Sequence, residues 1–295
     1  MIPQKVQEFL DGLVGRSDRT LASYRSFAEV FFTFLDKPVK KVTVKDILRF
    51  LKWGIDEQGW MLSTMRQYAT LTQRFMSEFM DEDFLKELKK QVRMLPRPRR
   101  YASLYEGVYV RSNRIDPFIA TAPNPKLKTV YTMILKWGFR ISETLRMSLE
   151  DIDAEARRVT ARGKGAGKEE KPRPVWVDRP SLRTVMSYAG CSEEQIMGKI
   201  PIKRTGNIVD IAPRTIQMNW KKTARQLNLP HWEKLTPHDG RHSYAIDFML
   251  KRKSQGIAAL TVLKNQLGHS DINTTMIYLD IAGSEARDIF EAGLE

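Results

Sequence analysis

The chain has 295 residues, 42% of them hydrophobic, which is enough for ordinary buried cores, excludes wholesale disorder and favours two domains. Lysine and arginine (49) outnumber the acidic residues (35), a net charge of +14. This surplus indicates a polyanionic partner such as DNA or RNA, and a solubilising surface or an anionic membrane are the alternatives that charge alone leaves open. One cysteine, Cys191, and four histidines exclude an internal disulfide and, in practice, a Cys/His zinc cluster, and we expect no metal and no cofactor.

The beginning of the chain shows no sign of export. Its first residues lack a basic region followed by a long apolar run, which argues against a signal peptide. The apolar stretches elsewhere are shorter than a membrane-spanning helix requires. Together with the single cysteine, these features predict a soluble cytoplasmic protein that is associated with DNA in the nucleoid and not with a membrane.

Residues 1–92 are predicted to form a small helical domain. Apolar side chains recur at helical spacing in four successive segments. Thr43 and Asp46 form a capping-box pattern ahead of the third segment, and Ser63 is a candidate cap of the fourth. Four short amphipathic helices make a compact bundle, a pattern that indicates packing and by itself no function.

A basic linker is predicted over residues 93–103. The stretch KKQVRMLPRPRRY (89–101) contains two prolines and six basic residues, so the segment should be extended. It can be a solvated tether or a strap that follows a phosphate backbone. In the second case its DNA-binding residues are Arg97, Arg99 and Arg100.

Residues 104–295 are predicted to form a larger, mostly helical domain. A buried helix is expected at 130–139 and further helices at 182–189 and 213–227, where Lys221 and Lys222 are candidate DNA contacts. Residues 157–177 read as two strands around a Gly/Lys turn. The chain is therefore expected to be mainly α, formally α+β, with a small antiparallel sheet in its second domain.

Two arginines are expected close to the core of this domain. In TPHDGRHSYAIDFML (236–250), His238 and Arg241 are three residues apart on one helix face, and Arg241 shares the buried side of that helix. In WGFRISETL (137–145), Arg140 follows a strongly apolar run. A buried guanidinium needs a partner, so each arginine is either held by a core carboxylate such as Glu143 or placed to bind an anion. Two such arginines favour a phosphate site, because a planar guanidinium group can bind two nonbridging oxygens of a phosphodiester at once.

The segment LGHSDINTTMIYLDI (267–281) supplies a histidine and a tyrosine. His269 follows Gly268 at the end of a helix, and Tyr278 lies nine residues later on a helical pattern. Considered alone, the histidine would usually be a residue that makes its hydrogen bonds at a helix end, and the tyrosine would usually be an aromatic residue of the core.

Taken together, these motifs resemble the tyrosine recombinases, the phage-type integrase family that includes the Xer-like site-specific recombinases. The order of arginine, lysine, His-x-x-Arg, histidine and tyrosine is that of the family, and the helical N-terminal region resembles its core-binding domain. The chain differs from the usual pattern at Gly240, where a larger apolar residue is common, and at Trp137, where threonine is more usual. The resemblance implies these catalytic residues: Arg140, Lys164, His238, Arg241, His269 and Tyr278.

The resemblance also implies the chemistry. Tyr278 would attack a phosphodiester of duplex DNA and form a 3′-phosphotyrosyl intermediate, with Arg140 and Arg241 stabilising the transition state and His238 assisting as a base. A lysine of the hairpin GKGAGKEEKPRP (163–174) would protonate the leaving 5′-oxygen. Lys164 fits the family motif best, and Lys168 and Lys171 are alternatives on the same turn.

His269 would donate a hydrogen bond to a nonbridging oxygen of the phosphate. Because several cationic and donor groups converge, the reaction needs no metal.

The family further implies that the two domains clamp duplex DNA, that a protein monomeric in free solution forms a homo-tetramer on two DNA sites, and that strand exchange passes through a Holliday junction. Residues 281–295 would dock on a neighbouring protomer.

A type IB topoisomerase shares the chemistry, and a non-catalytic helical DNA-binding protein with Tyr278 in its core is the alternative from another class. A metal-dependent nuclease or transposase is disfavoured, because no acidic cluster stands out in the sequence.

Overall fold

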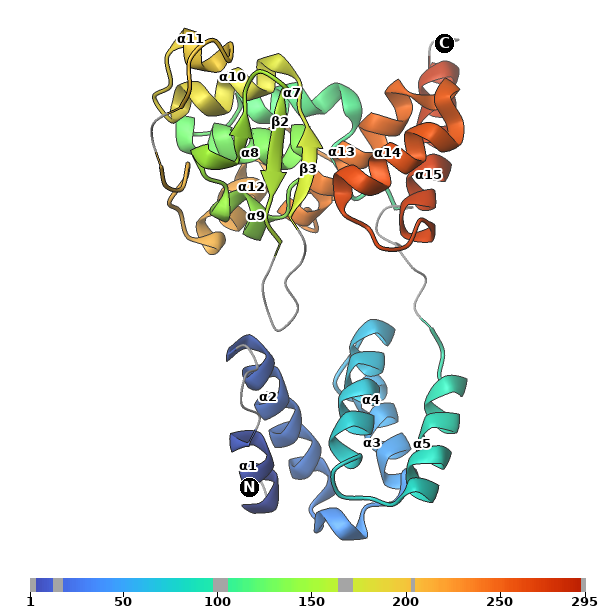
Figure 1. The fold of residues 1–295 in the computed structure, drawn as a ribbon. Coiled ribbons are helices and arrows are strands. Elements are labelled where there is room, and N and C mark those ends of the chain that lie inside the picture. Colours follow the sequence, from blue (N-terminus) through green and yellow to red (C-terminus); the bar gives the residue numbers. More distant parts are fainter. Residues whose placement is uncertain (1–3, 13–17, 98–105, 164–171, 203–204, 293–295) are drawn as a thin grey trace. The chain divides into compact units, whose positions relative to one another are not determined.

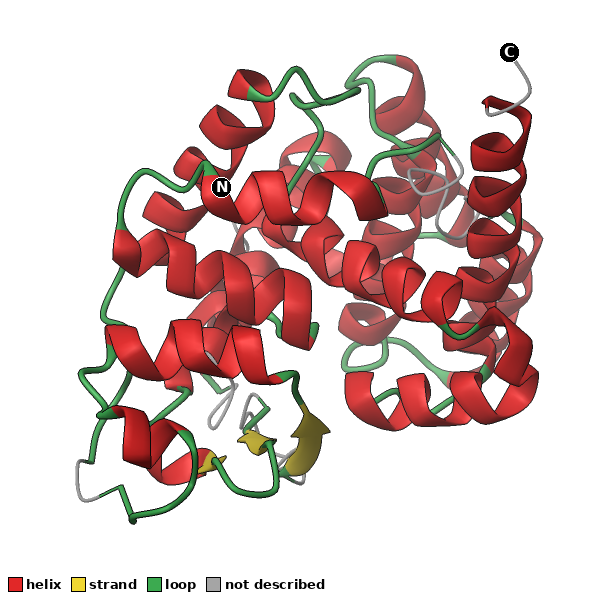
Figure 2. Cartoon of the chain, turned by 90° about the horizontal axis from the view of Figure 1, so that it is seen from above, coloured by secondary structure: helices red, strands yellow, loops and turns green. Residues whose placement is uncertain are grey.

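The computed structural model describes residues 4–12, 18–97, 106–163, 172–202 and 205–292. The chain divides into two compact units, Met1–Arg100 and Tyr101–Glu295, and each is described by itself (Figure 1). Helices make up most of the described residues, and the three strands are a minor part (Figure 2). The predicted fold class, mainly α with a small antiparallel sheet, is confirmed.

The described part of the first unit is a bundle of five helices. They are α1 (Gln4–Asp11), α2 (Asp18–Leu35), α3 (Val44–Asp56), α4 (Leu62–Met76) and α5 (Glu82–Met94), with a 3-10 turn at Val39–Lys41. The sequence predicts the first four. It does not predict α5, because the segment EDFLKELKKQVRM is largely charged and buries only Leu88 and Val92. The expectation of an extended linker is therefore wrong for residues 89–94, which form the end of this helix ahead of Pro96.

Phenylalanines fill the core of this unit. Phe27, Phe31, Phe50 and Phe75 have no exposed surface, and the rings of Phe31 and Phe50 meet edge to face with their centres 4.9 Å apart. Such edge-to-face contacts add to the free energy of burying the rings.

The predicted capping box that begins α3 is also confirmed, whereas the expectation that Ser63 caps the fourth helix is wrong: α4 begins at Leu62 after Met61, and no side chain caps it. The amide of Asp46 donates to Thr43 Oγ1 at 3.3 Å, and the amide of Thr43 donates to the Asp46 carboxylate at 2.9 Å. The two residues thereby satisfy amides that the first turn of a helix leaves without partners.

The second unit contains the sheet and the remaining helices. The strands are β1 (Ile152–Asp153), β2 (Arg158–Ala161) and β3 (Arg173–Trp176), joined antiparallel in the order β1-β2-β3 with Val159 opposite Val175. The sequence predicts β2 and β3, whereas β1 is too short to leave a pattern. The helices are α7 (Ile115–Ala120), α8 (Pro125–Trp137), α9 (Ile141–Arg146), α10 (Arg179–Tyr188), α11 (Glu193–Ile196), α12 (Pro213–Gln226), α13 (Pro237–Lys251), α14 (Gly256–Leu267) and α15 (Asn273–Ala292), with 3-10 turns at Ser112–Arg114, Leu149–Asp151 and Lys253–Gln255.

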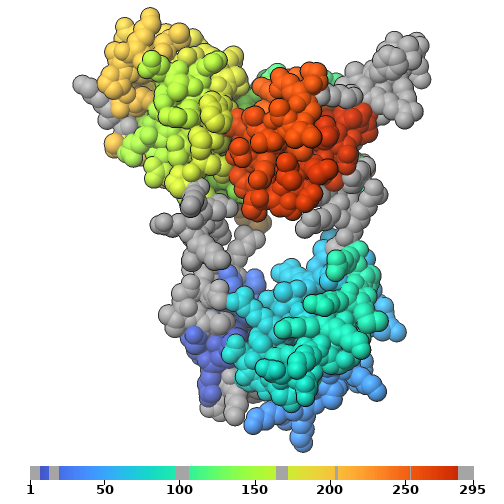
Figure 3. Space-filling model, turned by 45° about the vertical axis from the view of Figure 1, so that its right-hand side comes forward, coloured from blue at the N-terminus to red at the C-terminus, as the bar shows by residue number. Residues whose placement is uncertain are grey.

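Helix α13 is the central element of this unit. It packs against α8, α14 and α15, and all but three of its fifteen residues are buried. The strand β3 lies beside α14 on one face of the unit (Figure 3). Side chains from the end of α8, from β3, from α13 and from the end of α14 can therefore meet in one place.

In the described part of the chain, no helix combines the length and the apolar composition that crossing a membrane requires.

Candidate catalytic site

Arg241 is a deeply buried cation of the site. Helix α13 begins with a capping box, in which the amide and the hydroxyl of Thr236 donate to Asp239 Oδ2 at 2.8 and 2.7 Å, and Arg241 follows on the first inward-facing turn with 2% of its surface exposed. Its Nη1 donates to the carbonyl oxygen of Gly138 at 2.8 Å, and its Nη2 donates to that of Leu267. Carbonyl groups at the ends of α8 and α14 thus hold the guanidinium in place.

The charge of Arg241 survives this burial. Burial lowers the pKa of Arg241 to about 10, and the neighbouring Arg140 lowers it as well, while Glu143 acts in the opposite direction. A group with this pKa stays protonated at neutral pH. The predicted buried cation is therefore present at this position.

Arg140 occupies the turn between α8 and α9. Helix α8 ends at Gly138, whose φ of 69° is in the left-handed region, and Arg140 is the cap residue that starts α9. Its amide and its Nη1 both donate to the Glu143 carboxylate at 2.8 Å. About a third of the Arg140 side chain, 32%, is exposed, so this guanidinium can contact an anion outside the protein.

Glu143 joins three guanidinium groups. It has no exposed side-chain surface, and besides Arg140 it contacts Arg241 Nη1 at 3.5 Å and Arg173 through two hydrogen bonds of 2.7 and 3.0 Å. Burial by itself would raise the pKa of Glu143, but the hydrogen bonds and charge of Arg173 and then the charge of Arg241 outweigh it, and the pKa lies below its usual value. The two possibilities considered for the arginines, a core carboxylate and an anion site, are therefore compatible.

Arg173, on β3, is a site residue that the sequence does not single out. It directly follows the lysine-rich hairpin, where one more basic residue carries no signal. Gln266 was also missed: its side-chain amide accepts from the Trp176 amide at 2.9 Å and donates to the Trp176 carbonyl at 3.1 Å, which fastens β3 to α14.

Tyr278 lies on α15 with 1% of its surface exposed. Its hydroxyl is 2.8 Å from His242 Nδ1, and His242, one turn of α13 beyond His238, is the third residue that sequence reasoning missed. Burial lowers the pKa of His242 to about 3, with help from the charges of His238 and Arg241, so its ring is neutral at pH 7. In the HxxRH motif the histidine after the arginine reads simply as part of the helix.

His238 and His269 flank this pair. The His238 ring contacts the His242 ring at 4.7 Å between centres, and the His269 ring is stacked 6.4 Å from that of Tyr278. His269 Nδ1 lies 3.0 Å from the hydroxyl of Thr275. Burial and the nearby arginines, Arg241 first, lower the pKa of His269 to about 4 and lower that of His238, so both rings are neutral at pH 7.

The described structure thus brings together five of the six predicted catalytic residues, from three separate segments of the chain. The hairpin lysines Lys164, Lys168 and Lys171 lie outside the described residues, as do Arg99 and Arg100 of the linker. Arg97 is exposed after the end of α5, and Lys221 and Lys222 are exposed on α12. Within the described ranges, no group of three or more His, Cys, Asp or Glu side chains is arranged to hold a metal ion.

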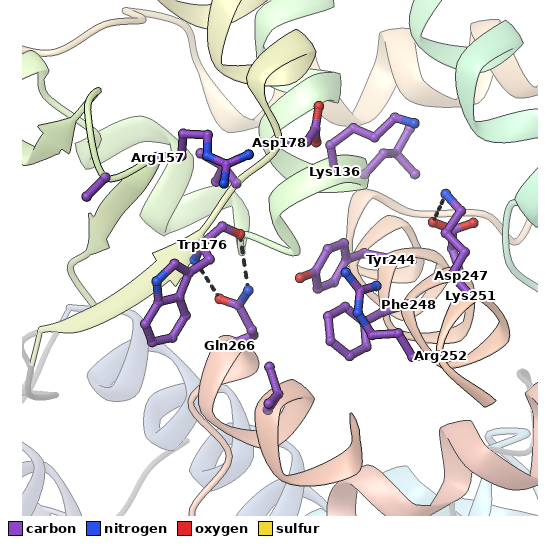
Figure 4. A pocket seen from close by; sticks show the side chains of 14 residues that line it. Lys136, Arg157, Trp176, Asp178, Tyr244, Asp247, Phe248, Lys251, Arg252 and Gln266 are labelled. Atoms are coloured by element: carbon purple, nitrogen blue, oxygen red, sulfur yellow. Dashed lines mark hydrogen bonds and ion pairs between the residues drawn. The ribbon is translucent and has the colours of Figure 1, made fainter. Parts of the chain in front are cut away.

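A separate pocket of about 510 Å³ opens between β3, α13 and α14 (Figure 4). Gln266 lies in its wall, so the pocket borders the segment whose carbonyl groups hold Arg173 and Arg241. It has an aromatic and basic lining with two acidic residues. Its aromatic residues are Trp176, Tyr244 and Phe248, its cations Lys136, Arg157, Lys251 and Arg252, and its carboxylates Asp178 and Asp247.

Two family models match the chain. Residues 110–285 match the phage integrase family, and residues 3–86 match the SAM-like N-terminal domain of phage integrases. The tyrosine recombinase XerA of Pyrococcus horikoshii is 25% identical over 279 residues, covering 95% of this chain and 89% of the relative. XerD of Staphylococcus saprophyticus is 25% identical over 306 residues, covering 98% and 97%.

Solved structures resemble the chain in fold. The XerH site-specific recombinase in a post-cleavage complex with its difH substrate has a TM-score of 0.67 at 16% identity, over 94% of this chain and 80% of that one. A lambda integrase dimer bound to a core site has a TM-score of 0.66 at 14% identity, over 96% and 97%. At such identities the similarity concerns the fold alone.

Proposed function

Since the chain belongs to the phage integrase family and, as a tyrosine recombinase, breaks and rejoins DNA, we propose that Tyr278 is the nucleophile of this site-specific recombinase. One observation carries the proposal. The Tyr278 hydroxyl lies in a cluster with two arginines and three neutral histidines, a set of groups suited to a phosphodiester and to a proton transfer.

The arginine pair, Arg140 and Arg241, binds the scissile phosphate. Pentavalent phosphorus carries more negative charge than the diester, so fixed guanidinium groups stabilise the transition state more than the ground state. Arg241 is held by two carbonyl groups before any substrate arrives, so its orientation costs little at the moment of reaction. Arg140 is partly exposed and completes the phosphate contact.

Tyr278 becomes the nucleophile after it leaves the interior. Its buried hydroxyl is paired with His242, so DNA binding has to be coupled to a movement of α15 that exposes it. The phenolic proton passes to neutral His238, and the oxygen then bonds to phosphorus.

The bond from phosphorus to the 5′-oxygen breaks, and Lys164 supplies the proton for that oxygen. The products are a 3′-phosphotyrosyl bond and a free 5′-hydroxyl. His269, neutral through its lowered pKa, donates a hydrogen bond to a nonbridging oxygen. A 5′-hydroxyl from a second duplex then attacks the phosphotyrosine and releases the tyrosine. Exchange of one pair of strands forms a Holliday junction, and exchange of the other pair resolves it.

Trapping the covalent intermediate tests the proposal. A duplex nicked a few nucleotides on the 3′ side of the cleavage site releases the short fragment that carries the new 5′-hydroxyl. Religation then lacks its attacking group, so the wild-type protein should accumulate on DNA as a covalent adduct. Tyr278→Phe should bind the same duplex and form no adduct. Adduct formation by Tyr278→Phe would reject Tyr278 as the nucleophile.

A sulfur-substituted substrate tests the lysine. With sulfur as the bridging 5′-atom, the leaving group is a thiolate, which needs little protonation because a thiol is far more acidic than an alcohol. Lys164→Ala should be nearly inactive on ordinary DNA and active on this substrate, and Tyr278→Phe should be inactive on both. If Lys168→Ala or Lys171→Ala shows this behaviour in place of Lys164→Ala, that lysine is the acid.

The recombinase acts as a homo-tetramer on two DNA sites, joined through residues 281–295 of each protomer. The tail from residue 285 contains four acidic residues and one arginine together with Ile289, Phe290 and Leu294. The pocket beside Gln266 has a complementary lining of four cations, three aromatic residues and two carboxylates. The tail of one protomer would occupy this pocket of the next, next to the segment that holds Arg241.

A further inference from the structure

The arginine pair faces an electrostatic conflict. Glu143 orients Arg140 and contacts Arg241, but its carboxylate also cancels one positive charge at the place where the phosphate needs it. The carboxylate is fully buried and its pKa lies below the usual value, so it remains charged. In a low-dielectric interior this loss is felt strongly.

Arg173 is placed to relieve this conflict. It engages both oxygens of Glu143, with Nη1 at 2.7 Å from Oε1 and Nη2 at 3.0 Å from Oε2. This two-point geometry is the strongest arrangement of a guanidinium with a carboxylate. Arg140 reaches the same carboxylate through one guanidinium nitrogen, and Arg241 only at 3.5 Å.

Arg173 itself is held away from the substrate. Its Nε donates to the carbonyl oxygen of Gln266 at 2.9 Å, and only 13% of its side chain is exposed. Its aliphatic part passes so close to Gly268 that a Cβ on that glycine would lie 2.8 Å from Arg173 Cδ. The three nitrogens are committed to internal partners, and the side chain is less exposed than that of Arg140, 13% against 32%.

From this geometry we propose that Arg173 is a positioning residue that neutralises Glu143, so that Arg140 and Arg241 both present uncompensated charge to the scissile phosphate. Three guanidinium groups and one carboxylate leave a net charge of two, and without Arg173 the net charge is one. The inference rests on the proposed function of the arginine pair. In this proposal Glu143 orients the arginine pair, and Arg173 preserves the positive charge of that pair by neutralising Glu143.

A substrate of altered charge separates this role from a structural one. A methylphosphonate at the scissile position replaces a charged nonbridging oxygen by a methyl group, so its transition state needs less positive charge. Single-turnover cleavage of both substrates is measured for the wild type, Arg173→Gln and Arg173→Lys. On the phosphodiester, Arg173→Gln should lose about 10- to 100-fold, less than the loss of a direct oxyanion contact. On the methylphosphonate its rate should lie within about 3-fold of the wild type, since the missing charge matters less there.

Further variants make the test specific. Arg173→Lys keeps the charge and should retain most of the phosphodiester activity. The pair Glu143→Gln with Arg173→Gln restores a net charge of two and should cleave the phosphodiester faster than Arg173→Gln alone. Equal losses by Arg173→Gln on the two substrates, or no loss on either, would overturn the inference.

Arg140→Ala distinguishes the inference from the function on which it rests. It removes a charge from the pair itself and should also lose less on the methylphosphonate. If Arg140→Ala shows that pattern and Arg173→Gln does not, only the role of Arg173 is rejected. If neither shows it, the arginine pair does not act through charge and both proposals fall.

Discussion

The imidazole of His242 lies next to the buried hydroxyl of Tyr278, the proposed nucleophile. Its ring stays neutral at pH values at which an ordinary histidine becomes protonated. The titratable and charged groups around it are His238 and Arg241 on its own helix, His269 after α14, and Tyr278 on α15. Burial with these neighbours lowers the pKa of His242 from 6.5 to about 3. Between these values the unfolded chain binds a proton at this residue and the folded chain does not, so the free energy of unfolding falls as the pH falls below 6.5.

This linkage predicts the pH dependence of stability. From pH 6.5 toward pH 4, His242 alone should reduce the free energy of unfolding by up to about 1.4 kcal/mol per pH unit. His242→Gln removes the titrating group and should show a correspondingly shallower dependence in urea unfolding over this range. At pH 7.5, where His242 is neutral in both states, the linkage adds nothing to the difference between the two proteins. Identical pH slopes for wild type and variant would contradict a lowered pKa.

At the same scale, the sequence predicts residues that belong to recognisable motifs and misses residues that act through tertiary contacts. Arg140, Arg241, His269 and Tyr278 stand in motifs, and the structure brings them into one cluster. Arg173 could not be predicted, because its significance depends on Glu143, 30 residues earlier, and on a carbonyl group 93 residues later. His242 was missed for a similar reason: its partner is 36 residues away.

At the scale of elements, helix ends were predicted best, because capping is a local interaction. The capping box at Thr43 and the glycine that ends α14 were read from a few adjacent residues, whereas Ser63, expected to cap α4, lies inside that helix. Helix α5 and strand β1 were not predicted, since one is largely charged and the other has two residues.

Gly240 shows how an element can explain a departure from the family pattern. A Cβ built on Gly240 would lie 2.5 Å from the Trp220 ring and 2.8 Å from Ile134. Trp220, on α12, is fully buried and its ring packs on those of Phe118 and Tyr131. The tryptophan ring therefore occupies the space that a larger residue at position 240 would need.

This packing predicts a compensating pair of substitutions. Gly240→Leu should destabilise the second unit by about 1–3 kcal/mol through overpacking, seen as a lower midpoint in thermal or urea unfolding. Trp220→Ala should also destabilise, by leaving a cavity. If the two sites share one space, the double variant should be more stable than the sum of the single effects predicts. Strict additivity would show that the leucine is accommodated elsewhere.

At the scale of the whole molecule, the basic surplus should govern DNA affinity. Lysines and arginines that contact phosphates release condensed counterions, so the affinity should fall steeply with salt concentration. Replacing Arg97, Arg99 and Arg100 together by glutamine should weaken binding to all duplex sequences about equally and flatten the salt dependence, with the slope falling by about 0.9 per lost contact. Replacing the exposed Lys221 and Lys222 of α12 by glutamine gives the variant for comparison. An unchanged slope after the linker change would identify the linker as a tether.

Shortening the chain at its end tests assembly, and the structure determines where it should be shortened. Ile281 and Ala282 are buried beside Tyr278 in the core around α13, so a truncation after Ile281 would remove a core contact as well as the tail. Truncation after Ser284 spares both residues. It should leave unfolding and single-site DNA binding unchanged and remove the slower, higher-order complexes on two-site DNA in native gels.

The proposed acceptor pocket provides the matched variant for this prediction. Arg157→Glu reverses a charge in the pocket lining at a residue that is not one of the candidate catalytic residues, and it should reduce higher-order complexes as the truncation does. In a mixture of the two variants, Arg157→Glu supplies an intact tail and the truncated protein supplies an intact pocket. Half of the contacts between alternating protomers can therefore form. Partial recovery in the mixture identifies tail and pocket as the two sides of one interface. Higher-order complexes that form normally with both variants would show that the tail packs only on its own domain.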